Sequence, residues 1–279
     1  MFEITAEDIA LLNDEDLRTL VGRLCEAEVR SRGFPTSSVT WGGHQNAADA
    51  GIDVRVALPA GTVTSGFVPR PATGFQVKKP DMPHNKILAE MRPSGMVRPA
   101  IHELADQSGA YIIVSSTGST SYLTRRHRLD AMAEAVSDLA NASALTLEFY
   151  DRTRLATWVR DRPGLIPWVR EKVGKAIQGW RPWGAWAFAP DGVTGEYLLD
   201  EKVRIQTGRK EAEGGLQTLE GIKRLRDRLR EPGRVIRLVG LSGVGKTRLV
   251  QALFDDRVGE DGLDPSLAIY TNMADGPDP

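Results

Sequence analysis

The stretch Gly51-Ile-Asp-Val-Arg-Val-Ala-Leu58 is followed, after a loop, by Gly74-Phe-Gln-Val-Lys-Lys79, and both stretches alternate apolar with polar residues. Such alternation predicts β-strands, because successive side chains of a strand point to opposite faces of a sheet. Each strand stops at a proline. The connection, residues 59–74, is too long for a tight hairpin and predicts a protruding loop. These two strands form the centre of the expected fold.

Helical and strand patterns surround this pair. Asn13 followed by Asp16 resembles a capping box, and apolar residues at helical spacing continue from there to Gly33, which predicts a helix of about 18 residues. Further along, the pattern predicts helices at 99–107 and 128–139 and strands at 111–115 and 145–150. This order of elements predicts an α/β domain with a mixed sheet flanked by helices.

A second motif lies near the end of the chain, where Gly240-Leu-Ser-Gly-Val-Gly-Lys-Thr247 has the G-x4-G-K-T pattern of a phosphate-binding P-loop. Gly240, Gly243 and Gly245 let the backbone curl around a phosphate. Lys246 can reach the β and γ phosphates of ATP, and Thr247 can hold Mg²⁺. The alternative is a glycine turn in an unrelated α/β domain.

The residues around the P-loop suggest an incomplete nucleotide-binding domain. We expect a buried strand at 234–240 before the loop and a helix after it, beginning near Arg248. Only one further strand candidate follows, at 267–272. The chain is therefore expected to be the N-terminal part of a longer protein that, by itself, binds or hydrolyses ATP poorly.

The chain length of 279 residues suits roughly two domains. We expect an α/β domain at 1–165, a connector at 166–232 and the beginning of a P-loop NTPase domain at 233–279. The connector contains Trp180, Trp183 and Trp186, which we interpret as packing residues rather than base-stacking ones. It ends in a charged helix at 218–230, whose apolar stripe favours packing on the NTPase over binding of phosphates by its arginines.

Polar residues on the first two strands suggest a reaction site. Gln76 and Lys78 share one face of their strand, and Asp53 on the neighbouring strand can converge with them. Metal-assisted phosphodiester cleavage needs oxygen ligands for Mg²⁺ and a cation near the scissile phosphate. The alternative is that Asp53 and Lys78 form a solvated pair on an ordinary half-exposed sheet.

These residues resemble the PD-(D/E)xK nuclease superfamily, in particular its Mrr-like restriction endonuclease branch, where the second acid is often glutamine. The resemblance covers roughly residues 15–150, and its matching segments are Trp41-Gly-Gly43, Ala50-Gly-Ile-Asp-Val54 and Gln76-Val-Lys78. It implies that Asp53 binds metal, that Val77 offers its carbonyl, that Lys78 assists catalysis, and that a glutamate of the first helix completes the site.

Two glutamates compete for that last position. Glu28 follows Leu24 by four residues and Cys25 by three, which places it on the apolar face that meets the sheet, whereas Glu26 lies off that face. We therefore choose Glu28 as the helix ligand. Because Gln76 is neutral, this glutamate would supply a larger share of the negative charge that binds the metal than it would in a site with two strand acids.

The domain order resembles bacterial antiviral STAND NTPases, in which a nuclease effector precedes the NTPase. The resemblance implies that a region beyond the NTPase senses a phage component, that ATP-dependent homo-oligomerisation follows, and that the effector then cleaves double-stranded DNA with Mg²⁺. Two other interpretations remain open. One is a regulatory or DNA-binding protein with an inactive nuclease-like domain, and the other is an ATP-dependent restriction component with the NTPase as motor.

Composition limits the remaining possibilities. A formal net charge of -1 excludes binding of nucleic acid by bulk charge, so any contact needs a local patch, for which Arg125-Arg-His-Arg128 is a candidate. No signal peptide or membrane span is visible, and we expect a cytoplasmic protein. The single cysteine, Cys25, and the histidines lack zinc-ligand spacing, so we expect no structural zinc and place Cys25 in the core.

Overall fold

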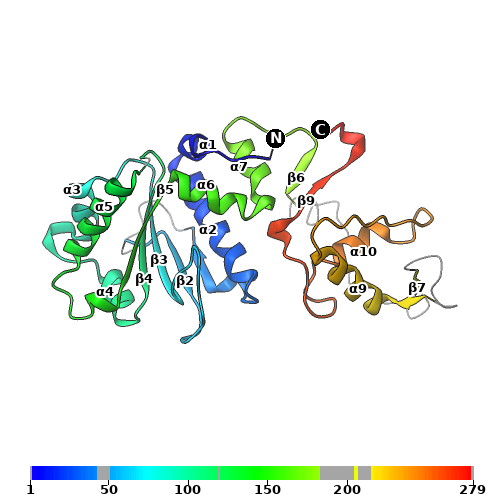
Figure 1. The fold of residues 1–279 in the computed structure, drawn as a ribbon, viewed down its shortest axis with the longest axis horizontal. Helices are drawn as coiled ribbons and strands as arrows, with labels where there is room; N and C mark the ends of the chain where they lie inside the picture. The colour runs from blue at the N-terminus through cyan, green and yellow to red at the C-terminus, as the bar shows by residue number, and fades with distance from the viewer. Residues whose placement is uncertain (1, 43–50, 119, 183–203, 207–214, 278–279) are drawn as a thin grey trace. The chain divides into compact units, whose positions relative to one another are not determined.

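A computed structural model describes residues 2–42, 51–118, 120–182, 204–206 and 215–277 of the chain. The chain divides into two compact units, one formed by Met1–Pro182 with Ile269–Pro279 and the other by Trp183–Ala268 (Figure 1). This division differs from the expected boundaries after residues 165 and 232. The segment after 165 belongs to the first unit because its helix α7 (Ile166–Lys172) contacts α1 (Ala6–Leu11).

The first unit begins with two helices that start at side-chain caps. Thr5 Oγ1 accepts a hydrogen bond from the Asp8 N–H ahead of α1, and Asn13 Oδ1 accepts one from the Asp16 N–H ahead of α2 (Asp14–Arg30). The cap at Asn13 confirms the expected start of the long helix. The expected apolar residues of α2 are all buried, namely Leu17, Leu20, Val21, Leu24 and Cys25.

Five strands form one mixed sheet in the order β1-β2-β3-β4-β5. Their bounds are Val39–Trp41, Val54–Ala57, Ala72–Lys78, Ala110–Ser115 and Thr146–Asp151. The pairs β1–β2 and β2–β3 are antiparallel, whereas β3–β4 and β4–β5 are parallel. The four strands predicted for this domain are all present, and β1 is an addition. The expected class, a mixed α/β sheet flanked by helices, is confirmed at this level.

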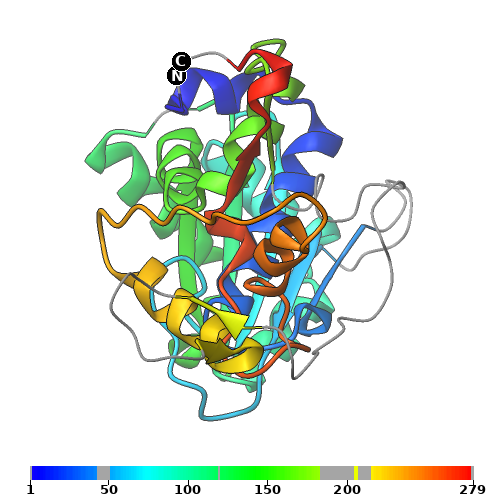
Figure 2. The same ribbon diagram turned by 90° about the vertical axis from the view of Figure 1, so that its right-hand side faces the viewer.

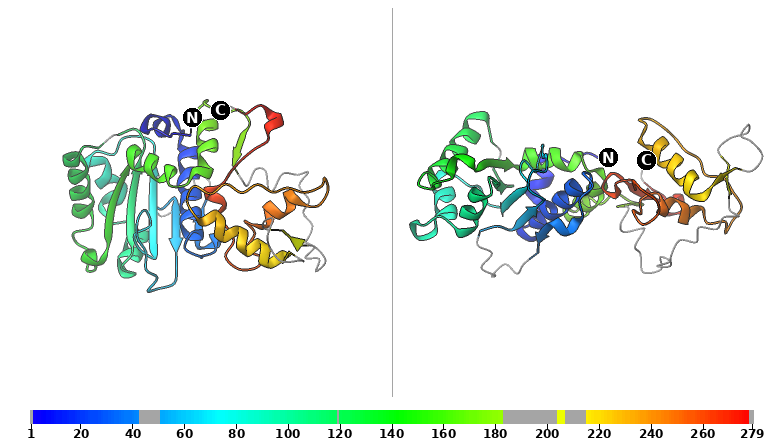
Figure 3. Two further views of the ribbon diagram at one scale, coloured as in Figure 1. Left: turned by 45° about the vertical axis from the view of Figure 1, so that its right-hand side comes forward. Right: turned by 90° about the horizontal axis from the view of Figure 1, so that it is seen from below.

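Side chains of the sheet alternate between two cores on opposite faces. On one face, Phe75 and Val77 pack with α1, α2, α6 (Arg152–Arg160) and α7. On the other face, Tyr111 and Ile113 pack with α3 (His84–Met91), α4 (Pro99–Asp106) and α5 (Tyr122–Ala135). The two groups of helices stand on either side of the sheet (Figures 1 and 3).

Two of the predicted segments of this unit need correction. The helix expected at 128–139 is α5, which begins earlier because Ser121 caps it by accepting the Thr124 N–H. The loop between β2 and β3 protrudes only in part. Val63 is 90% exposed, but Val68 is buried and Phe67 stacks on Trp158 with ring centroids 4.9 Å apart. Aromatic burial thus draws the second half of this loop into the core.

The first unit ends in an antiparallel pair of strands that are distant in sequence, β6 (Trp180–Pro182) and β9 (Ile269–Thr271). The strand expected at 267–272 therefore exists, but it pairs with the Trp-rich segment. Trp180 also packs edge-on against Phe2, with ring centroids 5.0 Å apart, which agrees with a packing role. Trp183 and Trp186 lie outside the described residues.

The second unit contains a short antiparallel pair, β7 (Arg204–Ile205) and β8 (Leu216–Gln217), followed by α9 (Thr218–Arg230) and α10 (Lys246–Ala252). Figure 2 shows α9 in yellow and α10 in orange. The charged helix lies at its predicted position. Ile222 of its apolar stripe packs with Ala252, the last residue of α10, and with Leu253, whereas Leu219 and Leu229 are exposed. The core of this unit is small.

The expected strand at 234–240 is absent from the second unit. These residues form no ladder with any described strand, and Val235 and Val239 are 95% and 81% exposed. A strand depends on hydrogen bonds to neighbouring strands. No described segment of this unit supplies such a neighbour, because β9 pairs with β6.

Short 3-10 helices connect several of these elements. Their bounds are Thr36–Ser38, Pro93–Gly95, Ala142–Ala144, Pro163–Leu165, Pro265–Leu267 and Met273–Asp275. Among the described residues, none of the helices combines the length and apolar character needed to cross a bilayer.

Candidate functional site

Asp53 lies where the chain enters β2, and both its backbone and its carboxylate bind β3. Its N–H donates to the Phe75 carbonyl at 2.8 Å, and the Val77 N–H donates to Asp53 Oδ2 at 2.7 Å. The carboxylate thus accepts the β3 N–H that a main-chain carbonyl of β2 would accept if the antiparallel pairing continued. Asp53 is held beside Gln76 and Lys78, as the strand pattern predicts.

Gly51 shapes the turn that delivers Asp53. Its φ of +87° lies in the left-handed region, and a Cβ there would come within 2.1 Å of Arg98 Cδ. The Tyr111 hydroxyl, from β4, donates to the Gly51 carbonyl at 3.3 Å. Only glycine fits this conformation and this space without strain, so the turn depends on Gly51.

Gln76 points to the face of the sheet opposite Phe75 and Val77, as predicted. It is only 4% exposed, and its Oε1 atom has no hydrogen-bond partner among the described residues. A buried amide oxygen without a donor costs about 1–3 kcal/mol. The oxygen is therefore available to a donor or a cation that enters the site.

Lys78 is paired with a residue that the sequence did not suggest. Its Nζ lies 3.2 Å from a carboxylate oxygen of Glu90, on α3, and Arg98 lies 2.9 Å from the other oxygen. The Glu90 side chain is 17% exposed. Its role was missed because the short helix α3 was not predicted, so nothing placed this glutamate above β3.

Arg18 of α2 is the second residue that sequence reasoning missed. Its guanidinium lies 3.8 Å from Asp53 Oδ1. A signal was present, because Arg18 precedes the buried Val21 by three residues and so borders the apolar face of α2. On the helix, the group that faces Asp53 is thus a cation instead of the expected carboxylate.

Glu28 is buried toward the sheet, as predicted, but it does not reach Asp53. Ten residues separate it from Arg18, which corresponds to about 15 Å along an α-helix. Its carboxylate is bound by Arg32 at 2.6 Å and Arg162 at 2.9 Å. The expectation that Glu28 completes the Asp53 site is therefore corrected. Glu26 does not complete it either, since it accepts a hydrogen bond from the Trp41 indole at 2.8 Å.

The electrostatics of Glu28 agree with a structural role. Burial raises the pKa of its carboxyl group, but hydrogen bonds from Arg162 and Arg32 outweigh burial and hold the pKa below its ordinary value. The carboxylate thus remains charged and ties the end of α2 to the segment after α6. The opposite balance holds for Cys25, where burial raises the thiol pKa and agrees with a core role.

Charges of the site converge on the buried phenol of Tyr111. Burial raises the pKa of Tyr111, the carboxylates of Glu90 and Asp53 raise it further, and Arg98 opposes them. With Arg18 and Lys78 included, these neighbours comprise two carboxylates and three cations. The site therefore has a slight excess of positive charge, which suits a phosphate.

A divalent cation finds only part of a ligand set here. Asp53 and Gln76 present oxygen atoms, which are the donors that Mg²⁺ prefers. Within the described part of the chain, no cluster of three or more His, Cys, Asp or Glu residues could hold a metal ion. The Gln76 oxygen without a partner fits a cation, but a complete ligand set would need further oxygen atoms from a bound molecule.

The P-loop segment adopts a tight curl in the second unit. Gly243 and Gly245 have φ values of +82° and +85°, which side chains disfavour. The ammonium of Lys246 donates to the carbonyls of Gly240 and Leu241 at 2.9 and 2.7 Å. The loop is thus held by its own lysine, and Thr247 is exposed beside it.

Arg226 of α9 anchors the helix that follows this loop. The residue is only 2% exposed. Its guanidinium donates to the carbonyls of Ala252 and Leu253, at 2.8 and 3.0 Å, and to those of Asp255 and Glu260. The guanidinium thereby links the end of α10 to the segment that follows it through four carbonyls at once. The charged pattern of α9 concealed this residue, because its other arginines face solvent.

The basic cluster Arg125–Arg128 is divided by the fold. Arg128 is 5% exposed, binds Asp81 at 2.6 Å and lies over the Phe149 ring, so it is not a surface cation. Arg126 and His127 remain exposed. The patch expected from four neighbouring residues is therefore smaller than the sequence suggested.

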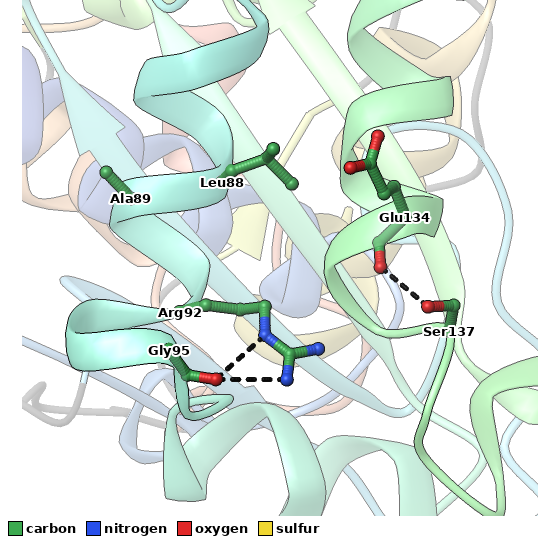
Figure 4. A pocket seen from close by; sticks show the side chains of 6 residues that line it. All are labelled: Leu88, Ala89, Arg92, Gly95, Glu134 and Ser137. Atoms are coloured by element: carbon green, nitrogen blue, oxygen red, sulfur yellow. Dashed lines mark hydrogen bonds between the residues drawn. The ribbon is translucent and has the colours of Figure 1, made fainter.

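A surface hollow of about 460 Å³ lies apart from these sites, between α3 and α5 (Figure 4). Arg92, which lines it, donates to the Gly95 carbonyl and pairs with Asp138, and Ser137 donates to the Glu134 carbonyl. Its polar groups already satisfy one another, so the hollow offers little to a ligand.

No family model, curated protein or solved structure matches this chain. The features of this chain that bear on its function are therefore the chemistry of Asp53, Gln76 and Lys78 and the P-loop.

Proposed function

We propose that the first unit is a metal-dependent DNA endonuclease with a PD-(D/E)xK-like site at Asp53, Gln76 and Lys78. One observation carries the proposal: the buried Gln76 oxygen lacks a partner beside a carboxylate and a lysine. Buried polar atoms in proteins nearly always have a hydrogen-bond partner, and a cation that enters the site would supply the partner that this oxygen lacks.

The residues divide the work as follows. Asp53 and Gln76 would hold Mg²⁺ through oxygen atoms, and a bound Mg²⁺ would polarise the scissile phosphate. Lys78 would bind a phosphate oxygen or orient the attacking water, and Glu90 positions its ammonium. Arg98 holds Glu90 in place. Arg18 would add a second contact to the phosphate on the α2 side.

A second candidate function is binding of DNA without cleavage. It is favoured by Arg18, which faces Asp53 where the nuclease resemblance leads one to expect a glutamate. A cation there lowers the affinity of the carboxylate for Mg²⁺. The same cation favours the phosphate itself, so the site would clamp the DNA backbone.

We further propose that the second unit binds ATP at Gly240–Thr247 and regulates the first. The glycine conformations and Lys246 support phosphate binding. In this proposal ATP promotes homo-oligomerisation, a phage-derived trigger is sensed elsewhere in the protein, and activated effectors cleave double-stranded DNA. The whole arrangement would be an antiviral defence protein of the STAND type.

The nuclease proposal is tested by incubating the chain with supercoiled plasmid and Mg²⁺, with and without EDTA. Asp53→Asn keeps an acceptor for the Val77 N–H but removes the charge, and should reduce nicking to the EDTA level. Lys78→Ala should slow nicking by at least about 100-fold. Asp161→Ala, which removes an exposed carboxylate after α6, serves as the matched control.

Two outcomes would separate the candidates. Nicking that persists in Asp53→Asn would place any nuclease activity elsewhere and sink the assignment. Tight duplex binding by the unmutated chain, with no cleavage at any concentration or with ATP, would favour the clamp.

A further inference from the structure

The first turn of α5 exposes two large apolar side chains. Tyr122 is 77% exposed and Leu123 is 63% exposed, directly after the capping Ser121. Single exposed apolar residues are common on proteins. Here two exposed apolar residues are adjacent at the start of a helix and have cations next to them, which indicates a binding surface more strongly than a single exposed residue would.

This turn lies on the same edge of the sheet as the candidate site. Thr120, just before it, donates to Asp151 at the C-terminal end of β5, and Thr117 donates to the Lys79 carbonyl after β3. Since β3 and β5 are separated only by β4, the two ends lie roughly 10 Å apart. A polymer bound at Lys78 would therefore pass close to Tyr122.

The charges along this edge favour an anionic partner. The described acidic groups near it have partners within the protein, since Asp81 pairs with Arg128 and Glu148 pairs with Arg125. Asp151 accepts from Thr120, and Asp14 accepts from the Lys79 N–H. By contrast, Arg126 has no ion-pair partner among the described residues and is exposed one turn after Tyr122.

Lys79 extends this positive charge toward the site. Its side chain forms no ion pair with any residue that the structure describes, and it directly follows Lys78 at the end of β3. The positive character fades at Asp130, one turn beyond Arg126. Arg126 and Lys79 thus lie near the edge that carries the candidate site.

We propose that Tyr122, Leu123, Arg126 and Lys79 form a docking surface for duplex DNA. This inference rests on the proposed function, because it adds the contact that holds the substrate beside Asp53 and Lys78. Arg126 and Lys79 contact backbone phosphates, and Leu123 with Tyr122 enters the minor groove, where apolar wedges contact base steps.

The test is equilibrium binding of a labelled duplex in EDTA, over a series of salt concentrations, so that cleavage is not required. Arg126→Ala should lower the slope of log K against log salt by about one phosphate contact. Tyr122→Ala/Leu123→Ala should weaken binding roughly tenfold and leave the slope unchanged.

Arg30→Ala and Val63→Ala are the matched controls, because both change exposed residues at the opposite end of the sheet, at the end of α2 and in the β2–β3 loop. Both should bind like the unmutated chain. Thermal unfolding of each variant checks that it is folded.

Three results would overturn the docking surface. These are no duplex binding by the unmutated chain, unchanged affinity of the Tyr122→Ala/Leu123→Ala variant, or preference for a single strand. The docking surface and the nuclease can fail independently. If these variants lose duplex binding but the unmutated chain shows no Mg²⁺-dependent nicking, the docking surface is supported and the nuclease proposal is not.

Discussion

Asp53 has a structural role in the strand pairing, in addition to the chemical role proposed for it. One oxygen accepts the Val77 N–H and so continues the hydrogen-bond pattern of β3, while the other lies 3.8 Å from Arg18. A substitution that removes both oxygens therefore damages the strand pairing as well as any metal site. This is why Asp53→Asn is the sharper test of chemistry.

The turn at Gly51 gives a prediction at the same scale. Gly51→Ala should destabilise the first unit by about 1–3 kcal/mol, because the positive φ strains alanine and the new Cβ meets Arg98. Gly61→Ala is the matched control, since Gly61 has a φ of +84° and open space around its Cβ position. Urea unfolding of both variants measures the difference, and equal losses would contradict a steric role for Arg98.

Glu28 gives a prediction about pH. Because its folded pKa is depressed below the ordinary value of 4.5, its contribution to stability is complete above that pH. The contribution is lost as the pH falls through the folded pKa. Glu28→Gln should therefore lower the unfolding free energy most above pH 4.5 and reduce its dependence on pH below that value. Glu171→Gln, the same change at an exposed position of α7, is the matched control.

At the scale of elements, the central strands behaved as their patterns predict. Strand β3 sends Phe75 and Val77 into one core and Gln76 toward the other, which is the alternation of a strand covered on both faces. The segment 234–240 has a similar apolar pattern but no strand partner among the described residues. An apolar pattern alone therefore does not make a strand.

The contact between α9 and α10 gives a prediction for the second unit. Arg226→Ala should destabilise it by about 3–5 kcal/mol, because four main-chain carbonyls lose the hydrogen bond from a buried guanidinium at once. Arg228→Ala, which removes an exposed cation paired only with Glu231 in the described structure, should have little effect. Hydrogen exchange of the α10 amides in the full chain measures both, and slow exchange in Arg226→Ala would contradict the prediction.

At the scale of the whole molecule, the two proposed activities lie in different units. The candidate nuclease site belongs to the first unit and the P-loop to the second. Regulation of one by the other must therefore pass between units, through assembly or through movement of one against the other. Such coupling is measurable as a mutual effect of ATP and DNA on each other's binding.

Nucleotide binding can be tested in the full chain by hydrogen exchange. ATP with Mg²⁺ should slow exchange at residues 240–252, since a ligand at about 100 times its Kd stabilises by about 2.7 kcal/mol. Lys246→Ala should abolish this protection, because it removes the ammonium group that we expect to move from the Gly240 and Leu241 carbonyls to the phosphates of ATP. Lys223→Ala, on the exposed face of α9, should keep it. Protection that persists in Lys246→Ala would contradict the P-loop assignment.

Local patterns in the sequence determined the elements of the first unit and part of its site. Alternation, helical spacing and the Asn13 cap depend only on neighbours along the chain, so the sheet strands, α2 and the convergence of Asp53 with Gln76 and Lys78 could be predicted. Only the tertiary structure decided the partners of these residues: Glu90 beside Lys78, Arg18 beside Asp53, Glu28 held by Arg162, and β9 paired with β6. Such pairs depend on how segments that are distant in sequence pack against one another, and a local sequence pattern does not specify that packing.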